Sequence, residues 1–266
     1  MLDPPLTTLA FLWRIERRDG VTLGFTSHDQ DLTRGGLIYK ATPGLIPSAV
    51  ERSDGFDADT VELAGALTSD AITEGDLSAG RWDGASLWLS LVDWHDPLAP
   101  AIPIVRGELG SIDISDGRFS AELRGASGVL DMPVIEETSP ACRASLGDKR
   151  CRVDLAPLHS MAIVVNQAQA TVTIAGAVSD GIYAFGQARW LDGPNGGLIS
   201  RIVDNVGAML SLREAPSFPI APGTRVELTQ GCDRRFATCT GRFANAANFR
   251  GEPHVPGNDL LTRYAA

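Results

Sequence analysis

Apolar and polar residues alternate along several short segments in the first half of the chain, a pattern typical of β-strands with one buried face. Residues 9–17 alternate in this way, and the Asp-Gly dipeptide at 19–20 predicts a tight turn into a second strand over 21–26. Residues 86–94 form another alternating segment. We therefore expect the N-terminal part of the chain to be built mainly from β-strands.

Two further features belong to this N-terminal part. Residues 104–114 and 118–125 flank an Asp-Gly dipeptide at 116–117, which favours a hairpin turn. Thr73 and Asp76 have the spacing of a helix N-terminal capping box, and the nearby glycines predict that the helix is short.

Six more segments, rich in β-branched or aromatic residues and separated by turn-forming dipeptides, lie between about 160 and 230. They cover residues 161–165, 170–174, 182–190, 197–204, 208–214 and 224–229. Several short strands at this spacing favour a small barrel or sandwich. The expected fold class is mainly β: two small β-barrel or sandwich domains with a short helix or two.

These patterns divide the chain into four parts. They are an N-terminal β domain over 1–137, a loop over 138–156 with the first cysteine pair, a barrel-like β domain over 157–230, and 231–266 with the second cysteine pair and an extended tail. From Thr240 onward the tail has few apolar side chains. We therefore expect another group to hold it in place.

The composition is that of a globular protein, with 266 residues of which 44% are hydrophobic and 21% charged. The net charge of −10 disfavours general binding to nucleic acid or anionic lipid, because both are negatively charged. No apolar run approaches the ~18 residues that cross a bilayer. Asp3 stands where a secretory signal would carry a basic residue. We expect neither membrane insertion nor export.

The four cysteines form two pairs, Cys142/Cys151 and Cys232/Cys239, with the spacings C-x8-C and C-x6-C and 80 residues between the pairs. In a reducing cytoplasm, paired cysteines more often bind metal than form disulfides. Zinc sites usually use shorter knuckles, whereas longer loops suit a larger [4Fe–4S] cluster with four thiolate ligands. Spacing alone leaves an iron–sulfur cluster, zinc, two disulfides and free thiols open.

Basic residues gather around both pairs, four of them within 142–152 and four within 232–250. Cations lower the pKa of neighbouring thiols and offset the negative charge of a four-thiolate site. Solvated basic loops or a nucleic-acid patch would have a similar composition. Because the charges follow the cysteines, we interpret them as charge compensation.

The sequence shows no recognisable active site outside the cysteine segments. His28 with Asp29 and Asp31 is interpreted as a polar loop rather than a metal or acid–base cluster. The sequence contains no P-loop, dinucleotide fingerprint, zinc-protease motif or nucleophile elbow. We therefore expect that the protein is not an enzyme.

At the cysteine segments the sequence resembles a known family. Residues 138–155 (TSPACRASLGDKRCRVDL) and 231–261 (GCDRRFATCTGRFANAANFRGEPHVPGNDLL) resemble the tail-tip or baseplate hub proteins of alphaproteobacterial gene transfer agents and related prophages. The cysteine spacing is also similar to that of the minor tail protein L of lambda-like phages. Residues 72–94 resemble the N-terminal half of the hub family, so the resemblance covers essentially the whole chain.

The resemblance implies that Cys142, Cys151, Cys232 and Cys239 hold a [4Fe–4S] cluster, which acts as a structural staple for the tail. It implies a homotrimeric hub in the tail tip of a phage or gene transfer agent particle, assembled in the host cytoplasm. The implied partners are the distal tail protein, megatron-like tip proteins and a tail peptidase, and DNA would pass through the lumen without specific binding. An iron–sulfur redox or sensor protein and a zinc-stabilised binding module are the alternatives.

Overall fold

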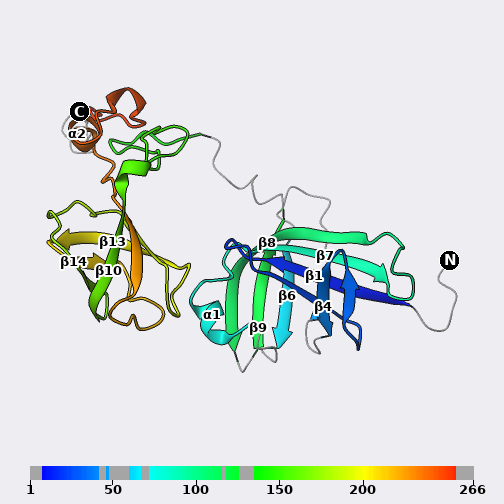
Figure 1. Ribbon diagram of the computed structural model, residues 1–266. Helices are drawn as coiled ribbons and strands as arrows, with labels where there is room; N and C mark the ends of the chain where they lie inside the picture. The colour runs from blue at the N-terminus through cyan, green and yellow to red at the C-terminus, as the bar shows by residue number, and fades with distance from the viewer. Residues whose placement is uncertain are drawn as a thin grey trace. The chain divides into compact units, whose positions relative to one another are not determined.

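The computed structural model describes residues 8–41, 46–47, 60–66, 72–115, 118–125 and 135–255. The chain divides into two compact units, Met1–Val134 and Ile135–Ala266. Figure 1 shows a broad sheet in the first unit and a barrel in the second. Each unit is described by itself below.

In the described part of the first unit, nine strands form one mixed sheet in the order β3-β4-β2-β1-β7-β8-β9-β6-β5. Neighbouring strands are antiparallel except β2 and β4, which run parallel. The strands are β1 Leu9–Glu16, β2 Thr22–Thr26, β3 Leu32–Arg34, β4 Leu37–Ala41, β5 Ile46–Pro47, β6 Thr60–Ala66, β7 Ser86–Asp93, β8 Ile102–Ser115 and β9 Arg118–Arg124.

The predicted N-terminal elements are confirmed. β1 and β2 form a hairpin that turns at Gly20, whose φ of 90° suits a residue without a Cβ. β8 pairs with β9, and Ser115 lies opposite Arg118; the predicted turn at 116–117 lies outside the described residues. The short helix α1 spans Glu74–Ser78, and the Thr73 side chain caps it by accepting a hydrogen bond from the backbone N–H of Asp76.

The core of the first unit lies between one face of this sheet and the segment around α1. Trp13 and Ile15 of β1 are buried there with Leu77 of α1 and Trp82. The alternating pattern predicts a single buried face for β1, but in its first half Leu9 is exposed and Phe11 half-buried, while Ala10 and Leu12 of the opposite face are buried. Ala10, Leu12 and Val92 form a second small cluster, which Leu32 and Tyr39 cover from the β3–β4 hairpin.

The second unit contains a closed six-stranded barrel in the order β10-β11-β14-β13-β12-β15. Its interior holds buried residues from every strand, such as Val164, Val172, Trp190, Leu210 and Leu228. The strands are β10 His159–Ala168, β11 Thr171–Ile174, β12 Gln187–Trp190, β13 Ile199–Val206, β14 Met209–Leu212 and β15 Arg225–Thr229. The short helices in the described part of this unit are the 3-10 turns η2 Ala156–Leu158 and η3 Ala246–Asn248 and the α-helix α2 Phe236–Gly241.

The mainly β fold class is confirmed, with two differences in detail. The barrel expected for the second domain is present, whereas the described strands of the first unit form an open mixed sheet rather than a barrel or sandwich. Residues 182–185, which the sequence pattern assigns to a strand, form turns instead. The buried Asn205 side chain accepts a hydrogen bond from the Tyr183 backbone N–H and donates one to the Ser179 carbonyl. These two backbone groups therefore find their partner in a side chain rather than in a neighbouring strand.

None of the helices in the described part of the chain is long and apolar enough to cross a membrane.

A bidentate ion pair at the start of β15 provides a test of acid stability. The Arg225 guanidinium donates to both carboxylate oxygens of Asp192, at 2.8 and 2.7 Å, and the Arg225 backbone N–H donates at 3.1 Å. These hydrogen bonds lower the pKa of Asp192 from 3.8 to about 2. Because the folded pKa is the lower one, the ionised pair stabilises the barrel above pH 3.8, and this contribution is lost as the pH falls toward 2.

We therefore expect Asp192→Asn to be less stable than the wild type at neutral pH, and the difference to shrink as the pH falls from 4 toward 2. Urea unfolding midpoints measured across this range test the prediction. Glu214→Gln, at an exposed carboxylate after β14, is the control and should change little. A wild-type advantage that stays constant down to pH 2 would contradict the argument.

Candidate metal centre

The barrel topology brings the two cysteine pairs to the same end of the second unit. The first pair precedes β10 and the second follows β15, and these two strands are antiparallel neighbours with His159 opposite Thr229. The Gln230 backbone N–H donates to the Leu158 carbonyl at 3.0 Å, which continues the pairing toward the cysteines. Figure 1 shows α2 and the loop before β10 at this end of the barrel.

All four cysteines line one pocket of about 820 Å³. All four are free thiols; Cys151 and Cys239 are buried, and Cys142 and Cys232 are half-buried. Phe243 and Phe249 contribute to the pocket wall, and so do barrel residues that include Gly186 and Thr229. The structure thus gathers every cysteine that the sequence singles out.

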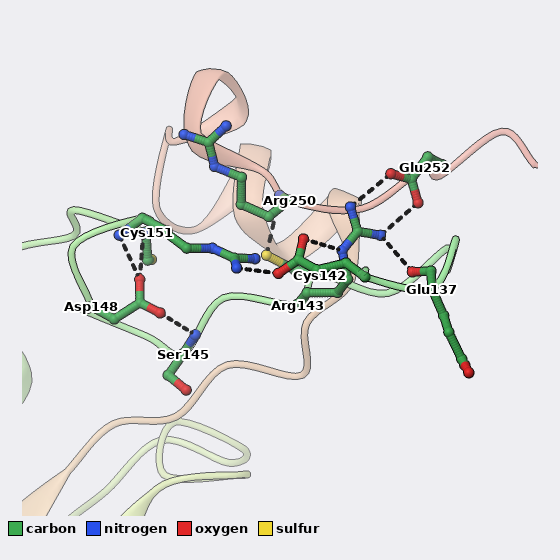
Figure 2. A network of polar contacts seen from close by, with 10 residues as sticks. Glu137, Cys142, Arg143, Ser145, Asp148, Cys151, Arg250 and Glu252 are labelled. Atoms are coloured by element: carbon green, nitrogen blue, oxygen red, sulfur yellow. Dashed lines mark hydrogen bonds and ion pairs between the residues drawn. The ribbon is translucent and has the colours of Figure 1, made fainter. Parts of the chain in front are cut away.

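The first cysteine loop is closed by one carboxylate. Asp148 accepts hydrogen bonds from the backbone N–H groups of Ser145 at 2.8 Å, Arg150 at 2.8 Å and Cys151 at 2.6 Å (Figure 2). These bonds lower the pKa of Asp148, and the bond from Cys151 has the largest effect. Asp148 therefore stays ionised and fixes the backbone that carries Cys151.

The second cysteine loop begins at a close backbone crossing. A Cβ at Gly231 would lie 2.1 Å from the Phe185 carbonyl carbon and 2.2 Å from the Gly186 nitrogen. The chain then reaches Cys232 and enters α2, which carries Cys239; the Cys239 backbone N–H donates to the Arg235 carbonyl at 3.0 Å. Only glycine fits at this crossing, so position 231 fixes where Cys232 lies.

Left-handed backbone conformations recur beside the cysteines. Arg152 follows Cys151 with φ 62°, Arg234 lies two residues after Cys232 with φ 63°, and Ala244 has φ 48°. Non-glycine residues rarely adopt this region, and such strain gathers at functional sites. At Arg234 the turn has a direct effect, because it directs the backbone N–H to the Cys232 sulfur at 3.4 Å.

Hydrogen bonds surround the sulfur atoms. The Arg250 backbone N–H donates to the Cys142 Sγ at 3.3 Å, and the Cys239 thiol donates to the Asn245 carbonyl at 3.4 Å. The Asn245 side-chain amide donates to the Cys151 carbonyl at 2.6 Å and lies 3.7 Å from its Sγ. Asn245 thus links one cysteine of each pair. Hydrogen bonds to cysteine sulfur are among the means by which proteins tune iron–sulfur clusters.

The electrostatics differ from the expected charge compensation. Burial, followed by Asp233 and the neighbouring thiols, raises the pKa of Cys232, although the Arg234 backbone N–H opposes this shift. Burial and the other three thiols raise the pKa of Cys239. The prediction that the basic residues lower the thiol pKa is therefore wrong for these two cysteines.

Three of the basic side chains have partners other than the thiols. Arg143 and Arg150 both form ion pairs with Glu136, and Arg242 donates to the carbonyls of Gly231 and Ile182. These three side chains therefore tie the loops together, whereas Arg234 and Arg235 line the pocket with the four cysteines.

Among the described residues, no group of three His, Cys, Asp or Glu side chains is arranged to hold a single metal ion. The donor set of the pocket is nevertheless four cysteines, and thiolates are the preferred ligands of iron–sulfur clusters and of zinc.

Residues that the sequence analysis missed also shape the site. Asp148 had a local signal, because an Asp one residue after Gly147 is typical of a turn that uses its side chain to bond the backbone. Asn245 and Glu252 contact residues more than 90 positions away, at Cys151 and Arg143. No local sequence pattern predicts such contacts.

The other candidate cluster does not form a site in the structure. The His28 Nδ1 lies 3.2 Å from Asp29 and from the Gln30 carbonyl, whereas Asp31 pairs with Lys40. These residues form local turn and ion-pair contacts, in agreement with their interpretation as a polar loop.

Two family models match parts of the chain. The family model "Baseplate hub protein, N-terminal attachment domain" matches residues 1–154, which include the first cysteine pair. The model "Phage conserved hypothetical protein BR0599" matches residues 181–259, which include the second pair. No curated protein matches the chain.

A solved structure extends the likeness to the full length. A chain from "Virion of native gene transfer agent (GTA) particle" is 37% identical, with a TM-score of 0.87, over 99% of this chain and 93% of that chain. With a family model over more than half of its residues and a relative this similar, the chain belongs to the baseplate hub protein family.

Proposed function

We propose that this protein is a structural hub in the baseplate of a phage-like tail, in a gene transfer agent particle or a phage. The observation that carries the proposal is the full-length likeness to a chain of a native gene transfer agent virion, at 37% identity. The family to which the chain belongs consists of baseplate hub proteins, and this supports a structural rather than an enzymatic role.

Within such a particle the protein would act with other structural proteins. We propose a homotrimer around the tail axis, with the distal tail protein, megatron-like tip proteins and a tail peptidase as neighbours. Closed cyclic symmetry is the ordinary arrangement for a component on an axial tube. The net charge of −10 suits a wall past which DNA moves without being bound.

The pocket at the end of the barrel supports a [4Fe–4S] cluster as part of this proposal. Cys142, Cys151, Cys232 and Cys239 would hold it, since all four line one pocket and two of them accept backbone N–H groups. A cube of this kind offers four iron corners, each of which takes one thiolate. The cluster would then join the loop before β10 to the loop after β15.

In this role the cluster is a structural staple. It would cross-link segments about 80–100 residues apart in sequence, which restricts the unfolded chain and stabilises the folded one. No electron-transfer partner is needed for that function. The residues around the pocket supply the rest: Asp148 fixes the Cys151 backbone, and Asn245 bridges Cys151 and Cys239 by donating hydrogen bonds to their backbone carbonyls.

Anaerobic purification, followed by iron, sulfide and zinc assays and a visible absorption spectrum, tests the cluster. We expect about four irons and four sulfides per chain with the broad absorbance of a [4Fe–4S] cluster. Zinc without sulfide would instead support a zinc-stabilised binding module, and protein without any metal would overturn the staple. A cluster that changes oxidation state during DNA delivery would favour the redox or sensor alternative.

The hub role is tested separately on the particle. Imaging of the assembled tail tip should show three copies of the chain around the axis, and deletion of its gene should leave tails without a complete baseplate. Six copies or a single off-axis copy would contradict the trimer, and normal tips without the chain would contradict the hub.

A further inference from the structure

Residues 250–252 cross the first cysteine loop and pair with it along the backbone. The Arg143 backbone N–H donates to the Arg250 carbonyl at 2.9 Å, and the Glu252 backbone N–H donates to the Ser139 carbonyl at 2.8 Å. The Ser139 backbone N–H donates in turn to the Glu252 carboxylate at 2.9 Å. We call residues 250–252 the strap.

A bidentate ion pair closes the strap. The Arg143 guanidinium donates to the two Glu252 carboxylate oxygens at 2.7 and 2.8 Å, and it also donates to the Glu137 carbonyl at 3.2 Å and to Glu136 at 3.1 Å (Figure 2). The Arg143 side chain is only 24% exposed. Charge-assisted, two-pronged contacts of this kind are among the stronger polar contacts in proteins.

The strap lies too close to the loop for any side chain between them. A Cβ at Gly251 would lie 2.5 Å from the Ala141 carbonyl oxygen, next to Cys142. Glycine at 251 therefore lets the two backbones come into contact. The neighbouring residues Arg250 and Glu252 can then form their backbone hydrogen bonds with Arg143 and Ser139 of the first cysteine loop.

The strap acts directly on one of the four thiols. It places the Arg250 backbone N–H at 3.3 Å from the Cys142 sulfur, while the Cys142 backbone N–H donates to the Arg234 carbonyl at 2.8 Å. Cys142 is thereby held between the strap and the loop that carries Cys232. Every one of these contacts is made by protein atoms alone.

We infer that Arg143 and Glu252 are positioning residues, which fasten the strap over the first cysteine loop and preorganise Cys142 for its ligand before any cluster is bound. The positioning of Cys142 as a ligand rests on the proposed cluster. The attachment of the strap to the first cysteine loop does not, because it is made by protein atoms alone. It also revises the expectation that a metal alone orders the tail, because the strap has its own attachment. Preorganised ligands bind more tightly because less ordering remains to be done.

Glu252→Gln tests the strap, because it keeps the side-chain shape and removes the charge that Arg143 binds. Arg143→Gln removes the other partner and should behave in the same way. Glu137→Gln is the matched control: it makes the same charge change beside Arg143, on the other side of the contact, yet only the Glu137 backbone carbonyl takes part in the network.

The first measurement is trypsin digestion of the metal-free protein, with cleavage after Arg242 and Arg250 followed by mass spectrometry. We expect protection in the wild type and in Glu137→Gln, and at least fivefold faster cleavage in Glu252→Gln and Arg143→Gln. Equal cleavage of the metal-free wild type and both strap variants would overturn the inference. This comparison stands even if the protein holds no cluster.

The second measurement uses the cluster-loaded protein. We expect the cluster of Glu252→Gln to be lost to a chelator about tenfold faster than in the wild type, since a charged hydrogen-bonded contact is removed. Weakening the hydrogen bond from the Arg250 backbone N–H to the Cys142 sulfur should also lower the reduction potential of the cluster. A loss of stability alone would not produce this shift. Unchanged loss rate and potential would show that the strap does not position Cys142.

Discussion

Replacing any one of Cys142, Cys151, Cys232 or Cys239 by serine is expected to prevent stable cluster binding and to lower the stability of the second unit by several kcal/mol. A serine hydroxyl is a poor substitute for a thiolate, so one corner of the cluster would lose its ligand. Because a bound cluster contributes its binding free energy to folding, the loss appears as lower stability. Iron content and urea unfolding under anaerobic conditions measure both effects.

A chemically matched control exists on the outer face of the barrel. Met161→Ser also exchanges a sulfur-containing side chain for serine, but Met161 is 61% exposed and is not part of the pocket. It should keep full iron content and near-wild-type stability. Near-stoichiometric iron in all four cysteine variants would refute the assignment of the ligands.

Gly231→Ala is expected to lower both the stability of the second unit and its iron content. The added methyl would meet only backbone atoms, at 2.1 Å from the Phe185 carbonyl carbon, 2.2 Å from the Gly186 nitrogen and 2.3 Å from the Ala184 oxygen. The two segments must move apart, which costs roughly 1–3 kcal/mol or more for overpacking and displaces the neighbouring Cys232. Urea unfolding should show the loss of stability, and the iron assay should show reduced occupancy.

Gly241→Ala is the control for this substitution. Gly241 ends α2 close to Cys239, but a Cβ there has no atom within 4 Å, and alanine favours helix more than glycine does. We expect its stability to equal or slightly exceed that of the wild type. If Gly231→Ala matched this control in stability and iron content, the crossing would not determine the position of Cys232.

Much of the fold follows from local periodicity. The β1–β2 hairpin, the β8–β9 pairing, the Thr73 cap and the barrel strands are all set by residues within a few positions of one another, and the sequence predicts them correctly. Such features can be predicted from sequence because the alternation of apolar residues directly reflects which face of a strand is buried.

The differences arise where distant residues decide the local structure. The face of β1 that carries Ala10 and Leu12 is buried because the β3–β4 hairpin packs against it. Residues 182–185 have strand-like composition, yet they form a turn in which the buried Asn205 side chain bonds the Tyr183 backbone N–H and the Ser179 carbonyl. In each case a contact from elsewhere in the fold overrides the local propensity.

The same distinction applies to the candidate site. Residue type and paired spacing are enough to single out the four cysteines, but the strap and the Asn245 bridge join residues about 90 to 110 positions apart. Their existence depends on the barrel topology, which no local pattern in either segment contains.

The pairing of β10 with β15 also bears on the order in which this unit assembles. While the barrel is open, the two cysteine pairs are separated by a chain of 80 residues, and their mutual effective concentration is low. Once His159 lies opposite Thr229, both pairs emerge from adjacent strand ends. The four thiols then become neighbours as a result of contacts made elsewhere. Residues inserted into barrel turns away from this end would leave their separation unchanged, so the length of the intervening chain is free to vary while the ligand geometry is preserved.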